Sequence, residues 1–285
     1  MEMESTNESH REVSEYYRRV MDGHVYMRET IGTLLEVLGA RVRRLGRPPR
    51  ILELGCHAGF TTEWFLERWP DADIVIQDTR EDLLAMVKER IGDRRVILHA
   101  GPPETVTAPV DVVVSFARHH HLPQDYLEGV RHVLAPGGVY LLAEELCPEY
   151  CTGDAAARIA RAELLHIAGG YVLTSREEVD AYRAGGAVPD HVADLERLRR
   201  RALWRWYRFV VDQAVERGYY DIAVAELQST HDDLITGSDA EHKFSPFIVE
   251  RQFALAGFEL LTKQSIGPTD DPERQSMIVY EYGRR

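Results

Sequence analysis

The chain has 285 residues, of which 44% are hydrophobic and 28% are charged, so it can bury one large core or two smaller ones. Its 47 acidic side chains outnumber its 34 basic ones, and a formal net charge of −13 argues against a protein that grips nucleic-acid phosphates. No apolar run approaches the roughly 20 residues that cross a bilayer, and the polar, acidic residues 1–10 do not resemble a secretory signal peptide.

The N-terminal segment is predicted to be helical. Residues 1–10 indicate a frayed tail, and apolar residues then recur at three- and four-residue steps from about residue 11 to residue 45. Gly23 and Gly32 favour a break, so two helices are expected rather than one long rod. Gly46 and the prolines that follow it end the second helix.

Short apolar runs then alternate with amphipathic segments up to Leu146. The predicted strands are 50–54, 72–77, 96–100, 110–116 and 139–143. The predicted helices between them are 60–69, 81–91 and 123–134. Strands that are apolar on both faces and alternate with helices of about ten residues imply a parallel sheet that is covered on both sides.

After Leu146 the alternation stops, and the segments 155–167, 176–183 and about 190–217 are predicted to be helices. The α/β pattern resumes at the C-terminus, where Ser245 is a good N-cap with Pro246 at the first helical position. The last two strands, 258–265 and 276–282, are expected to pair antiparallel.

These patterns divide the chain into three parts. The predicted parts are an N-terminal helical segment (1–49), a Rossmann-like domain (50–146 and 243–285) and a helical cap insertion (147–242).

The most informative segment is a loop of the pattern Glu-x-Gly-x-x-x-Gly, which begins at Glu53 and joins a strand to a helix. Gly55 and Gly59 allow the backbone to approach a bound nucleoside closely. Asp78 ends the next strand, where a carboxylate is placed to accept hydrogen bonds from two ribose hydroxyls.

The same loop argues against a dinucleotide. A dinucleotide site would have glycine at positions 57 and 60, but His57 and Phe60 stand there. The loop therefore favours a nucleoside ligand without a phosphate.

With these residues the sequence resembles the class I S-adenosylmethionine (SAM)-dependent methyltransferases, over 16–146 and again from about Phe244 to the end. The remaining motifs are the strand 111–116 with the segment His119-His120-His121-Leu122-Pro123 after it, and Leu134-Ala135-Pro136-Gly137-Gly138 before a strand. The resemblance implies an α/β, Rossmann-like fold. It has a seven-stranded, mostly parallel sheet with an antiparallel last strand, N-terminal helices, a helical cap insertion, and SAM as cofactor.

The resemblance also assigns cofactor-binding residues. They are Tyr16, Tyr17, Glu53, Gly55, Cys56, His57, Gly59, Asp78, Ser115 and Phe116. Gly55 and Gly59 would line the methionine and ribose portions of SAM, and Asp78 would bind the ribose diol. Glu53 would order the loop or reach the amino group of SAM.

Other contacts implied by the resemblance lie around the reacting centre. Ser115 and Phe116 would face the sulfonium, and Tyr16 and Tyr17 would close over the methionine end. An acidic residue is usual after the third strand, near the adenine amino group; here Glu104 is the substitute that the sequence offers.

The candidate catalytic residues are His119, His120 and Glu144. The histidines follow the fourth predicted strand, where an imidazole can act as a general base; packing at this rim is the alternative reading. Glu144 and Glu145 end the fifth strand, so one of the two is expected to face the site. No metal site is expected, because the ligand spacing is not diagnostic.

The cap region offers weaker candidates. His166, on a predicted helix, faces either the pocket or the core. The aromatic residues between Trp204 and Phe209 form either a pocket wall with cation–π attraction for the sulfonium or ordinary helix packing. The arginines at 199–201 form either a solvated face or a site for an acidic substrate group.

Three functions remain open. The first is a methyltransferase acting on a small molecule of the secondary-metabolite type, whose pocket is capped by the insertion. The second is a SAM cyclase like the azetidine-carboxylate synthases, which form azetidine-2-carboxylate and methylthioadenosine from SAM alone. The third is a non-catalytic SAM-binding protein.

The expected partner is a small-molecule substrate, with no nucleic acid and no membrane, and analogy with the family suggests a homodimer. The three cysteines cannot form a disulfide framework and favour a reducing, cytoplasmic location.

Overall fold

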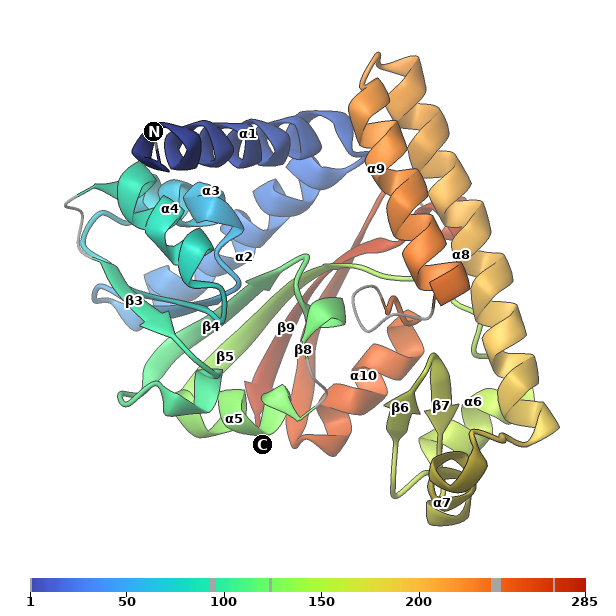
Figure 1. The fold of residues 1–285 in the computed structure, drawn as a ribbon. Coiled ribbons are helices and arrows are strands. Elements are labelled where there is room, and N and C mark those ends of the chain that lie inside the picture. The colour runs from blue at the N-terminus through green and yellow to red at the C-terminus, as the bar shows by residue number, and fades with distance from the viewer. Residues whose placement is uncertain (1, 93–95, 123–124, 237–241, 269) are drawn as a thin grey trace.

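The computed structural model describes residues 2–92, 96–122, 125–236, 242–268 and 270–285. Two helices, α1 (Glu2–Gly23) and α2 (Met27–Leu45), precede the sheet and lie at one side of it (Figure 1). They separate where predicted, and Tyr26 adopts a left-handed φ of 61° just before α2. Gly32, by contrast, does not interrupt α2. The predicted tail at 2–10 is wrong, because α1 starts at Glu2; extending an existing helix costs much less than nucleating one.

A seven-stranded sheet forms the centre of the molecule, which confirms the predicted fold class. Its strands are β1 (Arg50–Leu54), β2 (Asp73–Asp78), β3 (Val96–Ala100), β4 (Val110–Phe116), β5 (Leu134–Glu145), β8 (Phe258–Ile266) and β9 (Met277–Arg284). The order is β3-β2-β1-β4-β5-β9-β8, and β9 alone runs antiparallel to its neighbours. Between β1 and β4 the strand order reverses, which opens a crevice at their carboxyl ends.

Four helices connect these strands. They are α3 (Phe60–Arg68), α4 (Glu81–Ile91), α5 (Tyr126–Val133) and α10 (Pro246–Leu255). The predicted start of α5 at residues 123 and 124 lies outside the described residues. Ser245 stands at the N-cap of α10 as predicted, but its hydroxyl makes no capping hydrogen bond.

Strand β5 is longer than predicted and begins at Leu134. The segment Pro136-Gly137-Gly138 does not end the pairing with β4; it introduces a register shift, so that Leu134 pairs with Val110 and Val139 pairs with Val112. An irregularity of this kind lets a strand continue past residues that weaken the ladder.

The insertion contains α6 (Gly153–Ala160), β6 (His166–Ala168), β7 (Tyr171–Leu173), α7 (Arg176–Gly185), α8 (Asp190–Glu216) and α9 (Tyr220–His231). The predicted helix 155–167 is wrong in its second half. Gly169 and Gly170 both have positive φ, 53° and 83°, and form a two-residue turn between β6 and β7. His166 therefore lies on a strand rather than on a helix.

Helices α8 and α9 form a long pair at the side of the sheet opposite α3 and α4 (Figure 1). The short turns of the structure are His57–Gly59, Pro103–Thr105, His119–His121, Asp232–Thr236 and Pro272–Arg274. No helix in the described part of the chain combines the length and apolarity needed to cross a membrane.

Candidate active site

The glycine loop lies at the carboxyl end of β1, and four of its residues have left-handed backbone angles. Gly55 and Gly59 have φ of 76° and 86°, and between them His57 and Ala58 have φ of 40° and 54°. A Cβ atom added at Gly55 would lie 2.7 Å from Cγ of Arg118. Strained backbone of this kind often occurs where a loop binds a ligand, and a side chain at Gly55 would require both a strained φ and a shift of Arg118.

Glu53 ties this loop to the start of α3. Its two carboxylate oxygens accept hydrogen bonds from the hydroxyls of Thr61 and Thr62, the second at 2.5 Å. Burial raises the pKa of the Glu53 carboxyl to about 7, although the two hydroxyls act to lower it. These contacts agree with a loop-ordering role for Glu53.

The raised pKa of Glu53 predicts that folding stability falls as the pH rises. Below pH 4.5 the carboxyl is protonated in both states, whereas between pH 4.5 and 7 the folded state holds a proton that the unfolded chain has lost. We expect Glu53 to reduce the free energy of unfolding by roughly 3 kcal/mol across this window. Urea unfolding at pH 5 and pH 8 measures the change, and Glu53→Gln should remove that part of it. The exposed Glu67→Gln should keep the pH dependence of the wild type. An equal change in the free energy of unfolding between pH 5 and pH 8 in all three proteins would contradict the raised pKa of Glu53.

Asp78 lies beside the loop at the end of β2 and is buried. One carboxylate oxygen accepts a hydrogen bond from the backbone N–H of Cys56 at 3.2 Å, and the other accepts one from Arg80 N–H at 3.0 Å. The guanidinium of Arg118 is 4.0 Å away. Cys56 is buried against Asp78, and burial raises the pKa of its thiol, so this cysteine stays protonated.

A cavity of about 240 Å³, here called the main cavity, opens next to the loop. Tyr16 and Tyr17 of α1 line it together with His57 and Phe116. The His57 ring packs edge-on against Tyr17 at 5.6 Å and against Phe116 at 5.8 Å. Burial, followed by the charge of Arg118, lowers the pKa of His57 to about 4, so its ring is neutral. A neutral aromatic wall suits a sulfonium better than a charged one.

His120 borders the main cavity and is held by Glu144. Its Nδ1 lies 2.8 Å from Oε1 of Glu144, and Oε2 accepts the backbone N–H of His119 at 2.6 Å. Burial alone would raise the pKa of Glu144, but His120 and these hydrogen bonds outweigh it and keep the pKa below its usual value. Glu144 is therefore an anion that orients the imidazole, the arrangement that general bases use.

The other predicted rim residues lie deeper. Nδ1 of His119 contacts the hydroxyl of Tyr126 at 2.7 Å, and this hydroxyl lies 2.8 Å from that of Tyr140. Burial lowers the pKa of His119. Ser115 is fully buried in β4. Neither His119 nor Ser115 is among the described residues that line the main cavity.

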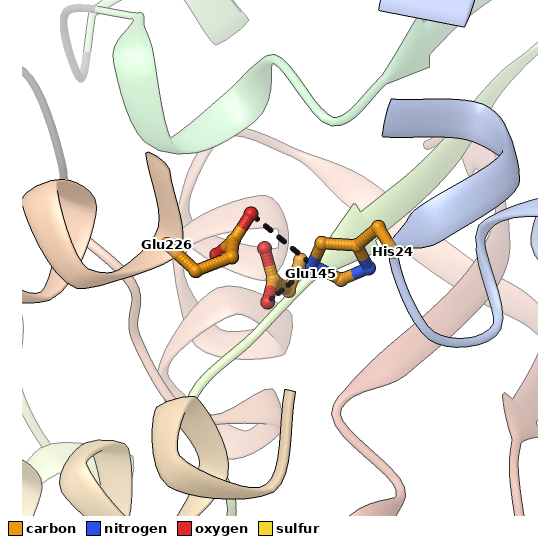
Figure 2. Close-up of side chains that lie close together, drawn as sticks. All are labelled: His24, Glu145 and Glu226. Atoms are coloured by element: carbon orange, nitrogen blue, oxygen red, sulfur yellow. Dashed lines mark ion pairs between the residues drawn. The ribbon is translucent and has the colours of Figure 1, made fainter. Parts of the chain in front are cut away.

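The inner end of the main cavity is charged. His24 from the end of α1, Glu145 from the end of β5, Glu226 from α9 and Lys243 all line it. Figure 2 shows the side chains of His24, Glu145 and Glu226 converging from three different elements. Glu145 thus lines the cavity itself, whereas its neighbour Glu144 is linked to the cavity through His120.

A second cavity, of about 410 Å³, lies beyond His120 and His121, which line both cavities. Ile167 and Gly169 of the β6–β7 hairpin also line this second cavity. The two cavities are therefore neighbours, with His120 and His121 between them.

Of the two alternatives for the cap residues, a wall of the main cavity is not what the described residues form. Trp204 is half exposed, and Trp206, Tyr207 and Phe209 lie outside the main cavity as far as the described residues define it. Trp206 and Tyr207 instead support the charged end, through Glu145 and Lys243. His166 lines neither of the two cavities.

One alternative for the arginine run is excluded. Arg199–Arg201 do not form one solvated face, because Arg199 is fully buried in ion pairs with Glu196 and Asp233. Glu104 is exposed and lies close to Gly129 of α5, and its contact with the adenine stays a prediction.

Sequence reasoning missed Arg118, His24, Glu226 and Lys243. Arg118 is the second residue after β4 and could have been found from that position, since side chains at strand carboxyl ends face the ligand in this fold. Glu226 belongs to α9, a helix that was not predicted. His24 and Lys243 reach the cavity only through the packing of distant segments.

Residues 51–138 match the family described as methyltransferase domain. The matched segment includes the glycine loop, Asp78, the histidines of the rim and the Pro-Gly-Gly segment at its end. This part of the chain is a class I SAM-dependent methyltransferase domain.

Two known relatives resemble this chain over part of its length. A trans-aconitate 2-methyltransferase of Rhodopseudomonas palustris (strain HaA2) is 38% identical over 60 residues, 20% of this chain and 23% of that protein. The corresponding protein of Streptomyces avermitilis is 37% identical over 108 residues, 35% of this chain and 40% of that protein. The chain thus spans less than half the length of these curated relatives.

Solved structures resemble the whole chain. A chain from the complex that contains the Haloferax volcanii Trm112 methyltransferase activator superposes with a TM-score of 0.51 at 12% identity, covering 95% of this chain and 93% of that one. At this identity the likeness concerns the fold alone.

Proposed function

We propose that the protein transfers the methyl group of SAM to a small-molecule acceptor held in the main cavity. The observation that supports this most is the lining of the cavity. Residues of the methyltransferase domain, such as His57 and Phe116, form one part of its wall, and residues of α1 and α9 form another. A concave site of this size, lined by residues of several elements, suits a metabolite better than a macromolecular surface.

The loop residues fit an adenosyl ligand. The bare backbone of Gly55, with its positive φ, lies next to the Asp78 carboxylate, so a ribose can approach both. The Arg118 side chain now lies over Gly55 and has to turn away from it when the ligand enters. SAM, when bound, supplies a methyl group on a positively charged sulfur. The acceptor attacks the methyl carbon in line with the carbon–sulfur bond, and the sulfur is the leaving group.

The residues of the chain then have distinct tasks. Asp78 holds the ribose hydroxyls, while Tyr17, His57 and Phe116 exclude water from the reacting centre without adding charge to it. His120, oriented by Glu144, takes the proton that a hydroxyl or amine acceptor loses on methylation.

Asp78→Ala is expected to weaken SAM binding at least tenfold, since it removes a charged acceptor from the ribose site. Isothermal calorimetry measures the affinity, and Asp71→Ala, an exposed aspartate in the turn before β2, serves as the matched control. An unchanged affinity in Asp78→Ala would refute the ribose assignment.

One observation favours a second candidate, the SAM cyclase. The main cavity, at about 240 Å³, is the smaller of the two cavities, and a site that admits the methionine arm of SAM without a second substrate leaves SAM as the only reactant. In this reaction the α-amino nitrogen would attack the γ-carbon, the carbon–sulfur bond would break, and methylthioadenosine would leave. The second cavity, in contrast, favours a separate acceptor.

Mass spectrometry of the protein incubated with SAM separates these functions. Methylthioadenosine and a cyclised amino acid from SAM alone would establish the cyclase. S-adenosylhomocysteine that forms only when an acceptor is added would establish the methyltransferase. SAM that binds but is never consumed in an acceptor screen would leave a non-catalytic binding protein and overturn the proposal.

A further inference from the structure

Three ligating atoms from separate elements meet at the inner end of the main cavity. They are Nε2 of His24, Oε1 of Glu145 and Oε1 of Glu226, and they lie within 4.8 Å of one another (Figure 2). All three residues are buried, and all three line the cavity. Buried carboxylates in a cavity wall are costly unless a cationic partner compensates them.

The His24 ring is oriented so that one nitrogen faces the carboxylates. Its Nδ1 lies 2.9 Å from the carbonyl oxygen of Val25, to which it donates. Its Nε2 lies 3.4 Å from Glu145 and 3.8 Å from Glu226, and within the described residues it has no hydrogen-bond partner, although the side chain is only 2% exposed. A buried ring nitrogen aimed into a polar cavity without a hydrogen bond is a place for a ligand atom.

Glu145 is held rigidly in this position. Trp206 donates its indole N–H to Oε1 at 2.6 Å, and the ammonium of Lys243 lies 3.2 Å from Oε2. Lys243 in turn donates to the hydroxyl of Tyr207 at 2.7 Å. The carboxylate is therefore preorganised, and it already binds one ammonium group of the protein itself.

We propose that His24, Glu145 and Glu226 form a subsite for an alkylammonium group, so that the molecule bound in the main cavity is a small protonated amine. An ammonium nitrogen has three N–H donors, and the subsite offers two carboxylate oxygens and one imidazole nitrogen within reach of a single atom. The inference rests on the proposed function in taking this cavity as the substrate site.

Charge balance favours a singly charged ligand over a metal ion. Burial alone would lower the pKa of His24, but Glu145 and Glu226 outweigh it and raise the pKa to about 9, so His24 is a cation at neutral pH. A bound ammonium allows His24 to give up its proton, and the total charge of the cluster stays the same. A divalent ion would add a charge beside the Lys243 ammonium.

NMR of protein labelled with ¹³C at histidine tests the subsite without requiring turnover. The probe is n-butylammonium, with n-butanol and butyrate as matched neutral and anionic probes, in metal-free buffer. We expect a saturable shift of the His24 Cε1–H signal with butylammonium alone; His24→Asn identifies that signal. Glu226→Gln should weaken butylammonium binding at least tenfold, and the exposed Glu216→Gln should leave it unchanged.

Four results would overturn the inference. The first three are no shift of the His24 signal with butylammonium, an equal shift with butanol, and butylammonium binding that survives in Glu226→Gln. The fourth is saturable broadening of the His24 signal by MnCl₂, which would identify a metal site.

The ammonium group has two sources, a separate acceptor or the α-amino group of the methionine arm, and S-adenosylhomocysteine separates them. If the subsite binds the α-amino group of the methionine arm, S-adenosylhomocysteine should compete with butylammonium and bind more weakly to Glu226→Gln. If the subsite binds the amine of a separate acceptor, S-adenosylhomocysteine and butylammonium should bind at the same time. Butylammonium binding in a protein that never consumes SAM would refute the proposed function and leave the subsite intact.

Discussion

Replacing His120 by alanine is expected to lower kcat by about 10²–10³-fold while the affinity for SAM changes little. The reason is that His120 is the cavity-lining imidazole held by a buried carboxylate, Glu144, at 2.8 Å. Such a base removes the proton from the nucleophile during methyl transfer. Release of S-adenosylhomocysteine, measured with the acceptor found in the screen, gives kcat, and calorimetry gives the SAM affinity.

A second variant and a control show whether the loss of kcat comes from the His120–Glu144 pair. Glu144→Gln should lower kcat in the same direction, because the neutral amide no longer stabilises the imidazolium that forms. The exposed His132→Ala, on α5, should behave as wild type. A His120→Ala protein with wild-type kcat at every pH would show that the acceptor loses its proton without this residue.

Replacing Arg199 by methionine is expected to lower the free energy of unfolding by about 3–5 kcal/mol. The guanidinium is 1% exposed and donates to Glu196 at 2.8 Å, to Asp233 at 2.7 Å and to the carbonyl oxygen of Lys243 at 3.2 Å. Without Arg199, Asp233 remains as a buried anion that, among the described residues, keeps one long backbone contact, from Lys243 N–H at 3.5 Å. Urea unfolding measures the loss, which corresponds to a fall in Tm of about 10 °C.

The chain provides matched comparisons for this prediction. Arg201→Met, two positions along α8 and exposed, should change the free energy of unfolding by less than about 0.5 kcal/mol. Adding Asp233→Asn to Arg199→Met should restore part of the loss, because the double variant no longer buries an uncompensated Asp233 carboxylate. Equal stabilities of Arg199→Met and Arg201→Met would contradict the role of the buried network.

The prediction of the sheet succeeded where the sequence pattern is local. Strands 96–100 and 110–116 and helix 81–91 have the predicted bounds, because apolar runs and capping residues act over a few positions. It failed in the insertion, where Gly169 and Gly170 redirect the chain into a hairpin within a stretch of helical pattern. Two adjacent glycines are a turn signal, and the apolar periodicity around them concealed it.

The candidate site shows the same division. The glycine loop, Asp78 and the rim histidines were identified from the sequence because each is fixed by its position at the end of a strand. The pattern of β5 also predicted that Glu144 and Glu145 face opposite sides. Which of them borders the main cavity depends on the helices packed above, and it is Glu145 that does so.

Residue pattern alone was enough to locate the seven strands of the central sheet, the bare-backbone loop at the end of β1 and the match of residues 51–138 to the methyltransferase domain family. These features depend on residue types at short spacing, which act through backbone sterics and hydrophobic periodicity. Only the tertiary structure brought His24, Glu145 and Glu226 together and buried Arg199 between Glu196 and Asp233. Such contacts join residues as far as about 200 positions apart, and their energy depends on burial and distance, which local pattern does not encode.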